Sequence, residues 1–161
     1  MIDGFLFVLT VVTAVACGLV AGFFFAFSTT VMKALARLQG TQGMTAMQSI
    51  NVVVINPLFM TALFGTAIAC GVLVVASVIE WGEPYAVYLL LGGVLYLVGA
   101  ILTTIAYHVP RNDALATVDP NSPDAERHWR QYAKTWTAAN HVRTVGALVA
   151  AALFTVALRV S

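Results

Sequence analysis

Long apolar runs alternate with short polar stretches along this chain. A bilayer core of ~30 Å needs about 20 helical residues to cross it. Four runs reach that length: Gly4–Met32, Leu58–Ile79, Tyr85–Tyr107 and Asn140–Val160. A backbone inside lipid has to satisfy its own hydrogen bonds, so each run is predicted to be a helix. The expected fold is all-α: one membrane-embedded domain over residues 1–161, a polytopic bundle of four transmembrane helices.

The first long connection is predicted to contain a further helix. Its apolar and amide side chains recur at helical spacing, at Met44, Met47, Asn51 and Val54. This pattern is typical of a short interfacial helix. Asn56 then precedes Pro57, an order that predicts an N-cap and the first turn of the second membrane helix.

The fourth helix is expected to begin well before the membrane. Ser122-Pro123 forms a second predicted cap, followed by Asp124 and Glu126, where the helix dipole favours anions. From there one stripe of side chains recurs every three or four residues: Trp129, Tyr132, Trp136, Asn140 and Arg143. We therefore expect a helix that starts near Pro123, has its first turns in the cytoplasm and enters the membrane unbroken.

The composition supports a membrane protein. The chain is 60% hydrophobic and 9% charged, against about 25% charged residues in a soluble domain. A net charge of +1 gives no reason to expect nucleic acid as a partner. The first apolar run follows Asp3 without any Lys or Arg and is too long for a signal-peptide core, so we expect it to be retained.

The charges in the connections predict the orientation. The first and third connections hold six cations: Lys33, Arg37, Arg111, Arg127, Arg130 and Lys134. The second holds Glu80 and Glu83 and no cation. The positive-inside rule therefore predicts a multi-pass protein of the cytoplasmic (inner) membrane with both termini extracytoplasmic, Arg159 being the exception.

Small residues recur at steps of four on several predicted helices. The first helix carries Ala14, Gly18, Gly22 and Ala26, and Gly65 with Ala69 and Gly146 with Ala150 repeat the pattern. Such faces let a neighbouring helix approach closely. We expect them to pack helices within the chain, and they are also candidates for homo-oligomer contacts.

Polar side chains gather at one end of the predicted bundle: Ser28, Thr29, Gln48, Asn51, Asn56, His108, Asn112, Asn140, His141 and Arg143. Ionisable groups within a span usually face inward and indicate function. Structural alternatives exist, because Arg143 could extend to lipid phosphates and Trp129 and Trp136 could form an interfacial belt. His108 could end the third helix. His141, flanked by Asn140 and Arg143, is the strongest functional candidate.

Several kinds of chemistry are not supported. The second to fourth apolar runs contain no carboxylate, so the ligands of a di-iron bundle are missing. His128 lies in a charged turn, which argues against a three-histidine zinc site. Haem between His108 and His141 is conceivable but has no motif behind it. No phosphate loop, nucleophile elbow or CxxC pattern is present. We therefore expect no metal and no cofactor.

Four stretches resemble, in order, the anthrone-oxygenase-like family of small four-helix membrane proteins. They are GFFFAFSTTVMKAL (22–35), MQSINVVVINPLF (47–59), HVPRNDAL (108–115) and WTAANHVRT (136–144). Fungal members oxidise a polyketide anthrone to an anthraquinone with dioxygen, without metal or flavin. The resemblance implies a cofactor-independent oxygenase acting on an electron-rich aromatic substrate. The chain departs from the family pattern at His108, Arg111 and Ala139, and the last change removes an aromatic ring.

The residues present suit that chemistry. A base would form an enolate, which then reduces dioxygen, and a histidine titrating near neutral pH suits the proton step. Cations and amides would stabilise the oxyanion. We expect His141, Arg143, Asn140 and Asn112 to be catalytic. The expected substrate-binding residues are Trp136, Tyr132, Asn51, Gln48, His108 and Asn56.

Two expectations concern the shape of this site. Trp136, Asn140 and Arg143 should share one inward helix face, and His141 should contact the third helix from the side. We further expect Asn51, His108 or Asn112 within hydrogen-bond reach of Asn140, His141 or Arg143.

A second interpretation belongs to a different class. The chain could be a non-catalytic membrane subunit, or a module binding lipid or quinone within a larger complex. The expected partners are thus a small aromatic or lipid-like molecule and membrane lipids. An oxygenase pocket should be enclosed and reach His141, whereas a headgroup site should open sideways to lipid.

Overall fold

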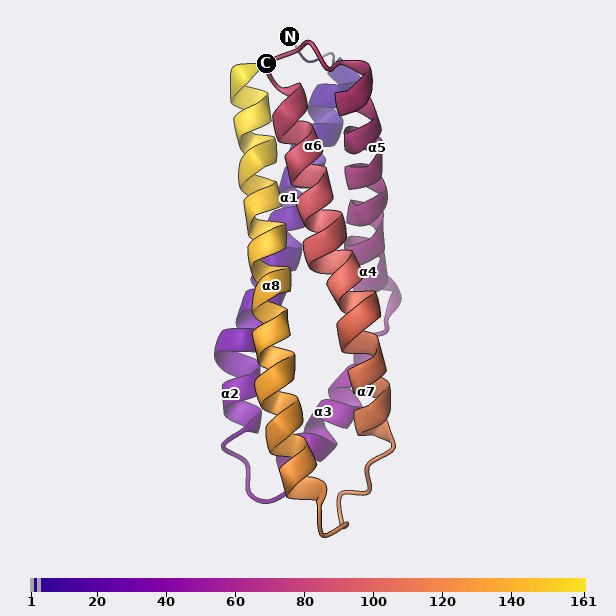
Figure 1. Ribbon diagram of the computed structural model, residues 1–161, viewed down its shortest axis with the longest axis vertical. Helices are drawn as coiled ribbons and strands as arrows, with labels where there is room; N and C mark the ends of the chain where they lie inside the picture. Colours follow the sequence, from indigo (N-terminus) through magenta and orange to yellow (C-terminus); the bar gives the residue numbers. More distant parts are fainter. Residues whose placement is uncertain (1, 3) are drawn as a thin grey trace.

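Four long helices run side by side in the computed structural model, which describes residue 2 and residues 4–161 (Figure 1). Each is long and apolar enough to cross a membrane: Gly4–Leu35, Pro57–Ile79, Ala86–Ala116 and Ala125–Val160. Within the described part of the chain there is no strand. The predicted all-α fold with four membrane-spanning helices is confirmed.

Three of the four long helices contain π-helical segments, labelled η. The first comprises α1 (Gly4–Ala26), η1 (Phe27–Val31) and α2 (Met32–Leu35). The separate helix α3 (Gln42–Val53) follows. The second comprises α4 (Pro57–Met60), η2 (Thr61–Gly65) and α5 (Thr66–Ile79). The third comprises α6 (Ala86–Leu95), η3 (Tyr96–Leu102), η4 (Thr104–His108) and α7 (Val109–Ala116), and the fourth is α8 (Ala125–Val160).

The fourth helix is unbroken over its 36 residues, as predicted, but its cap differs from the prediction. Asp124 occupies the N-cap position without a side-chain cap, and the Ala125 N–H donates to the Ser122 carbonyl at 3.1 Å. Because Ser122 closes a backbone turn, its hydroxyl does not cap the helix. The other predicted cap is confirmed, since Asn56 Oδ1 accepts from the Phe59 N–H at 3.0 Å.

The third helix extends further than expected. We predicted its end at Tyr107, but α7 continues it to Ala116 in spite of Pro110. Proline lacks an N–H and clashes with the preceding turn of a regular helix. The π-helical turn η4 comes directly before it, and such a change of register lets a helix continue past the disruption. His108 therefore lies inside the helix and does not end it.

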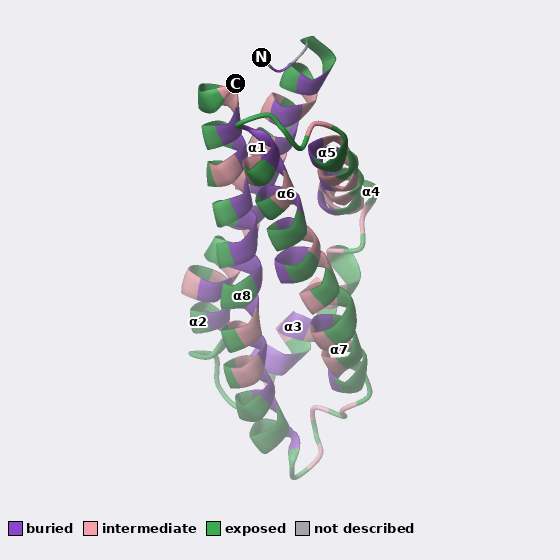
Figure 2. Ribbon diagram, turned by 45° about the horizontal axis from the view of Figure 1, so that its top comes forward, coloured by how far each residue is buried: buried purple, intermediate pink, exposed green. Residues whose placement is uncertain are grey.

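The interior divides into two clusters of buried side chains. The first lies between the four long helices and is centred on Cys17, Leu73, Tyr96 and Phe154. The second joins α3 to α8 through Met44, Met47, Trp129, Tyr132 and Trp136. Helix α3 crosses the bundle obliquely between α2 and α7, at the end away from the termini (Figure 1). Buried residues line the inward faces and exposed ones the outward faces (Figure 2).

The close helix contacts are not those expected for α1. A Cβ added to Gly18 or Gly22 would meet nothing within 4 Å, so these two glycines allow no close helix approach within the described chain, although Ala14 of the same stripe packs against the core. The buried face of α1 instead carries larger side chains, including Thr13, Cys17 and Phe24. The prediction holds for Gly146, whose added Cβ would lie 3.0 Å from the Cα of Gly99. Here α8 and η3 touch through their backbones.

Candidate active site

A cavity of about 610 Å³ lies inside the end of the bundle that holds α3. Its walls come from α1 and η1, α3 and the segment after it, α4 and η2, η4 and α7, and α8. The walls are mostly apolar, with phenylalanines contributed by α1, η1, α4 and η2 at Phe23, Phe24, Phe27, Phe59 and Phe64. The few polar side chains on the wall include Gln48, Asn51, Thr104, His108, Asn112, Asp113 and Arg143. Apolar pockets of this size with a few placed polar groups are typical of small-molecule sites.

The exposed apolar residues of this wall mark an opening. Val52 and Ile55 are 73% and 72% exposed, and Phe64 and Val109 are 41% and 45% exposed. These side chains belong to α3 and the segment after it, to η2 and to α7, so the cavity opens through an apolar rim on the outside of the bundle.

Arg143 is the most unusual group in this wall. It lies on α8 and is only 6% exposed. Its Nε and Nη2 donate to Asn140 Oδ1 at 3.0 and 2.6 Å, and its Nη1 donates to Thr104 Oγ1 at 3.2 Å. The guanidinium carbon lies 4.2 Å from the centroid of the Phe24 ring and 5.1 Å from that of Trp136. Among the described residues no carboxylate forms an ion pair with it; the pairs found are Arg127–Asp124 and Arg130–Glu126.

Asn140, which accepts the two hydrogen bonds from Arg143, is fully buried. Its Nδ2 donates to the Phe24 carbonyl and to Ser28 Oγ, both at 2.7 Å. Since Phe24 can only accept at its carbonyl and Arg143 can only donate, the orientation of the amide is fixed. Asn140 thus joins the first long helix to α8 and holds the guanidinium at the cavity wall.

His108 is 1% exposed and lines the cavity from η4. Its Nδ1 lies 3.2 Å from the Thr103 carbonyl and its Nε2 lies 3.4 Å from the Trp136 carbonyl. A neutral imidazole can donate to one of these oxygens and an imidazolium can donate to both. The ring also meets Trp136 edge-on, with centroids 5.0 Å apart. In the neutral ring one of the two nitrogens therefore faces a carbonyl oxygen without a proton between them.

Asn112 orders the aromatic side of the site. Its Oδ1 accepts from the Tyr132 hydroxyl at 2.8 Å and from Trp136 Nε1 at 3.0 Å. This arrangement leaves Trp136 on the cavity wall, while Tyr132 lies behind it and does not line the cavity. The interfacial-belt alternative for Trp129 and Trp136 is wrong, because both are 4% exposed.

Two amides of α3 differ in their hydrogen bonding. Gln48 Nε2 donates to the carbonyls of Leu115 and Val118, at 2.9 and 3.0 Å, and so ties α3 to the end of α7. Asn51 Nδ2 is buried and has no hydrogen-bond partner among the described residues. A buried amide without a partner is costly, and it lies on the wall of a cavity. Asn51 is therefore a candidate donor to a ligand, with the Tyr132 side chain as its neighbour within the protein.

The structure brings six of the predicted site residues to the cavity wall: Gln48, Asn51, His108, Asn112, Trp136 and Arg143. Trp136, Asn140 and Arg143 share one buried face of α8, as predicted. Asn56 caps α4 and lies outside the cavity lining. The direct hydrogen bonds expected between Asn51, His108 or Asn112 and Asn140, His141 or Arg143 are not found in the described part of the chain. Instead, Arg143 donates to Thr104. His108 faces the Trp136 carbonyl, and Trp136 Nε1 donates to Asn112.

His141 lies elsewhere. It is exposed and lines an outer groove with Ser28 and Thr29, so it faces η1 and does not contact the third helix as expected. A rotation of about 100° per residue separates it from Asn140 on the helix. His108 and His141 therefore lie on different sides of α8. In this arrangement the two side chains do not ligate one haem iron.

Two wall residues were missed by the sequence reasoning. Thr104 precedes His108 by four residues, a spacing that puts both on one helix face, and this signal could have identified it. Asp113 is exposed at the cavity wall, and nothing in the sequence distinguishes it from other polar residues of the same stretch. The phenylalanine walls follow from the run that begins at Phe23 together with Phe59.

Comparison with protein-family models gives one match, to the family described as anthrone oxygenase, over residues 57–153. The matched range is more than half of the chain. The protein belongs to the anthrone oxygenase family. No curated protein and no solved structure matches the chain. The matched range includes His108, Asn112, Trp136 and Arg143, whereas the walls contributed by α1, η1 and α3 precede it.

Proposed function

We propose that this family member oxidises an electron-rich, flat aromatic molecule with dioxygen and binds it in the cavity in anionic form. The observation that carries this proposal is Arg143, a cation within a membrane-spanning helix with no carboxylate partner among the described residues. Burying such a charge costs several kcal/mol, so its presence favours a ligand that brings negative charge. An enolate or phenolate is such a ligand, and the phenylalanine walls suit its rings.

The proposed chemistry starts at a ring methylene group. His108 removes one proton from it, and the resulting enolate oxygen is held by Arg143. The enolate gives one electron to dioxygen, and recombination of the two radicals forms a peroxide at that carbon. Loss of water then gives the ketone, so that CH₂ and O₂ become C=O and H₂O. Asn51 donates to a second oxygen of the substrate.

The proton acceptor in this scheme is His108 and not His141, because only His108 lies on the cavity wall. Both ring nitrogens face backbone carbonyls, of Thr103 at 3.2 Å and of Trp136 at 3.4 Å. The scheme therefore requires Nε2 to turn away from the longer of these contacts to take the substrate proton, after which the imidazolium can donate to both carbonyls again. Arg143 supplies a planar fork that a lysine cannot reproduce.

Activity measurements on the purified protein in lipid nanodiscs test the proposal. With anthrone as the probe, we expect one dioxygen to be consumed for each quinone formed. An oxygen electrode measures the dioxygen consumed, and absorbance measures the quinone. Arg143→Gln and His108→Gln should lower kcat/KM at least ~100-fold and Arg143→Lys at least ~10-fold. The matched control is Arg159→Gln, which removes a cation at the far end of α8.

His141→Ala separates the two assignments of the base. Retained activity in this variant supports His108, whereas lost activity at an unchanged melting temperature supports His141. Wild-type turnover no faster than in empty nanodiscs would contradict an oxygenase acting on this substrate. Unchanged activity in Arg143→Gln would contradict the role of the guanidinium.

A second candidate function is supported by two features that differ from those expected of an oxygenase pocket: the cavity opens through an exposed apolar rim, and it does not reach His141. A module that binds a neutral quinone from the bilayer would use the same opening and the amide donors without turnover. Quinone binding at equal affinity in wild type and Arg143→Gln, without oxygen uptake on any anthrone, would favour this alternative.

We also infer the location. The protein is placed in the cytoplasmic (inner) membrane with its cation-bearing end in the cytoplasm and both termini outside, supported by the distribution of Lys and Arg.

A further inference from the structure

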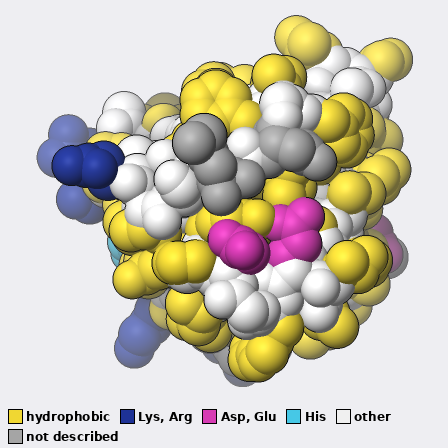
Figure 3. Space-filling view, turned by 90° about the horizontal axis from the view of Figure 1, so that it is seen from above, with side chains coloured by type: hydrophobic (Ala, Val, Ile, Leu, Met, Phe, Trp, Pro, Cys, Tyr) yellow, Lys and Arg dark blue, Asp and Glu magenta, His cyan; other side chains and the backbone are white. Residues whose placement is uncertain are grey.

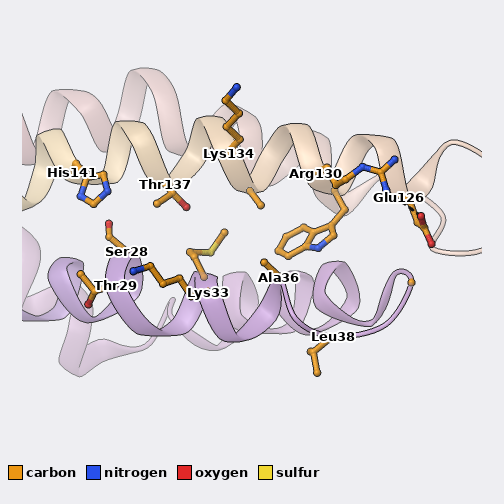
Figure 4. Close-up of a pocket in the computed structure, with 14 residues that line it drawn as sticks. Ser28, Thr29, Lys33, Ala36, Leu38, Glu126, Arg130, Lys134, Thr137 and His141 are labelled. Atoms are coloured by element: carbon orange, nitrogen blue, oxygen red, sulfur yellow. Dashed lines mark hydrogen bonds and ion pairs between the residues drawn. The ribbon is translucent and has the colours of Figure 1, made fainter.

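A second hollow, of about 660 Å³, lies on the outside of the bundle between η1–α2 and α8 (Figure 4). We call it the outer groove. No residue of its lining also lines the cavity of Arg143. Its inner wall includes Ser28, whose oxygen accepts from Asn140. The outer groove is therefore a separate site on the opposite side of the Asn140 contact, and binding there does not depend on the proposed oxidation.

The outer groove is positively charged. Lys33 contributes a cation from α2, and Arg130 and Lys134 contribute cations from α8. Glu126 is its one carboxylate within the described residues, and it pairs with Arg130 at 3.2 Å. No ion pair is found for Lys33 or Lys134 in the described part of the chain. Of these two unpaired cations, Lys33 is directed along the groove and Lys134 extends outward from its α8 side (Figure 4).

Donor groups converge inside the outer groove. Figure 4 shows Thr137 and His141 directed from α8 toward the first long helix, and Lys33 lying along that helix toward Thr29. Lys134 extends outward from the α8 side. A tetrahedral anion between the two helices would thus meet an ammonium, a hydroxyl and an imidazole, which are all able to donate to phosphate oxygens.

The level of the groove along the bundle indicates the source of that anion. Beyond His141 the outward side of α8 is apolar, with Val142, Val145 and Leu148 53–58% exposed. Before it come Lys134 and Arg130. The outward side of the first long helix also changes from apolar to cationic, between Phe25, which is 59% exposed, and Lys33. Both helices change from lipid-facing to cationic at this groove, where the phosphates of a bilayer lie.

We propose that the outer groove binds the phosphate headgroup of an anionic phospholipid. Lys33, Thr137 and His141 hold the phosphate, Lys134 adds charge at the rim, and the acyl chains lie along the exposed valine and leucine side chains of α8. A soluble phosphate would use the same donors but would leave this apolar surface unused. The lipid also bridges the two helices that Asn140 joins, so its binding stabilises the protein.

Lipid-retention measurements test the site. The purified protein is mixed in detergent with phosphatidylglycerol or phosphatidylcholine of equal chain length, and native mass spectrometry gives the bound fraction. Each lysine near an anionic headgroup contributes about fivefold in affinity. We expect wild type to prefer phosphatidylglycerol by roughly tenfold or more, and its melting temperature to rise only with this lipid. Lys33→Gln combined with Lys134→Gln should remove the preference.

The matched control combines Arg37→Gln with Arg127→Gln. It removes the same charge at the same end of the molecule but outside the groove lining, and should keep the preference. If the lysine variant does not fold, Ala133→Glu is used, which adds a carboxylate to the groove wall and should also abolish retention.

Three results would overturn the proposal. They are equal binding of the two lipids by wild type, equal losses in the lysine variant and its control, and full displacement of phosphatidylglycerol by millimolar inorganic phosphate. The last result would identify a free-anion site and not a lipid site.

Discussion

Asn140 joins groups from two helices inside the membrane region: the Phe24 carbonyl, the Ser28 hydroxyl and the guanidinium of Arg143. Every hydrogen of its amide is donated and its oxygen accepts twice from Arg143. Polar groups placed this way are compatible with a helix in lipid because each has a partner within the protein. The same arrangement leaves the charge of Arg143 available to a ligand at the wall of the cavity.

Asn140→Ala should therefore be severely destabilising. It removes the acceptor of two Arg143 hydrogen bonds and leaves a buried cation poorly solvated, at an expected loss of about 2–4 kcal/mol in the free energy of unfolding. Thr144→Val is the control one turn later, because the Thr144 hydroxyl donates only to its own helix, at the Asn140 carbonyl. Thermal melting in one detergent compares the two variants. Equal melting temperatures would contradict the role given to Asn140.

Asn51 and Gln48 allow a paired test of the cavity. Asn51→Leu removes a buried donor without a partner among the described residues, so stability should stay equal or rise by up to about 1 kcal/mol while ligand affinity falls. Gln48→Leu breaks two hydrogen bonds to α7 and should lower stability by about 1–3 kcal/mol. Melting curves with and without the aromatic ligand distinguish the two effects. A larger loss of stability in Asn51→Leu would show that its amide has a structural partner.

At the scale of elements, periodicity predicted which residues of α8 share a face but not which neighbour that face meets. The spacing of Trp136, Asn140 and Arg143 places them together whatever the bundle, and all three are buried. The side on which His141 lies depends on how α8 is packed by the first and third long helices. That packing is a property of tertiary structure, which a single helical pattern does not contain.

Local signals explain the remaining differences in the elements. The Asn-Pro cap at Asn56 was predictable because its hydrogen bonds are within one turn. The continuation of the third helix past Pro110 was not, because proline ordinarily ends or kinks a helix and the π-helical turn before it has no clear sequence signature. For the same reason the sequence suggested that His108 and Asn112 lie at a helix end.

Glycine positions on two helices give opposite predictions. Gly146→Ala places a Cβ 3.0 Å from both the Gly99 Cα and the Leu95 carbonyl oxygen, so α8 must move away from η3 and the end of α6. We expect a loss of about 1–3 kcal/mol. Gly22→Ala meets nothing within 4 Å and should leave the monomer unchanged or slightly more stable. Thermal melting measures both, and a comparable loss in both variants would indicate that Gly22 packs against a second copy of the chain.

At the scale of the whole molecule, the two ends carry different charges. The start of α1, the end of α8 and the connection between α5 and α6 lie at one end (Figure 1). Seen from that end, acidic side chains gather among hydrophobic ones (Figure 3). The connection between α5 and α6 contains Glu80 and Glu83. The opposite end carries six cations: Lys33, Arg37, Arg111, Arg127, Arg130 and Lys134.

This polarity predicts that both termini are extracytoplasmic. We expect the cation-bearing connections to stay in the cytoplasm because Lys and Arg close to membrane helices resist translocation. A reporter active only in the cytoplasm should be inactive when fused after Ser161 and active when inserted between Asp119 and Ser122. The opposite pattern would contradict the orientation. Replacing Glu80 and Glu83 by lysine reduces the charge difference, so this double variant should give a mixed signal at Ser161, whereas Glu80→Gln with Glu83→Gln, which adds no cation, should not.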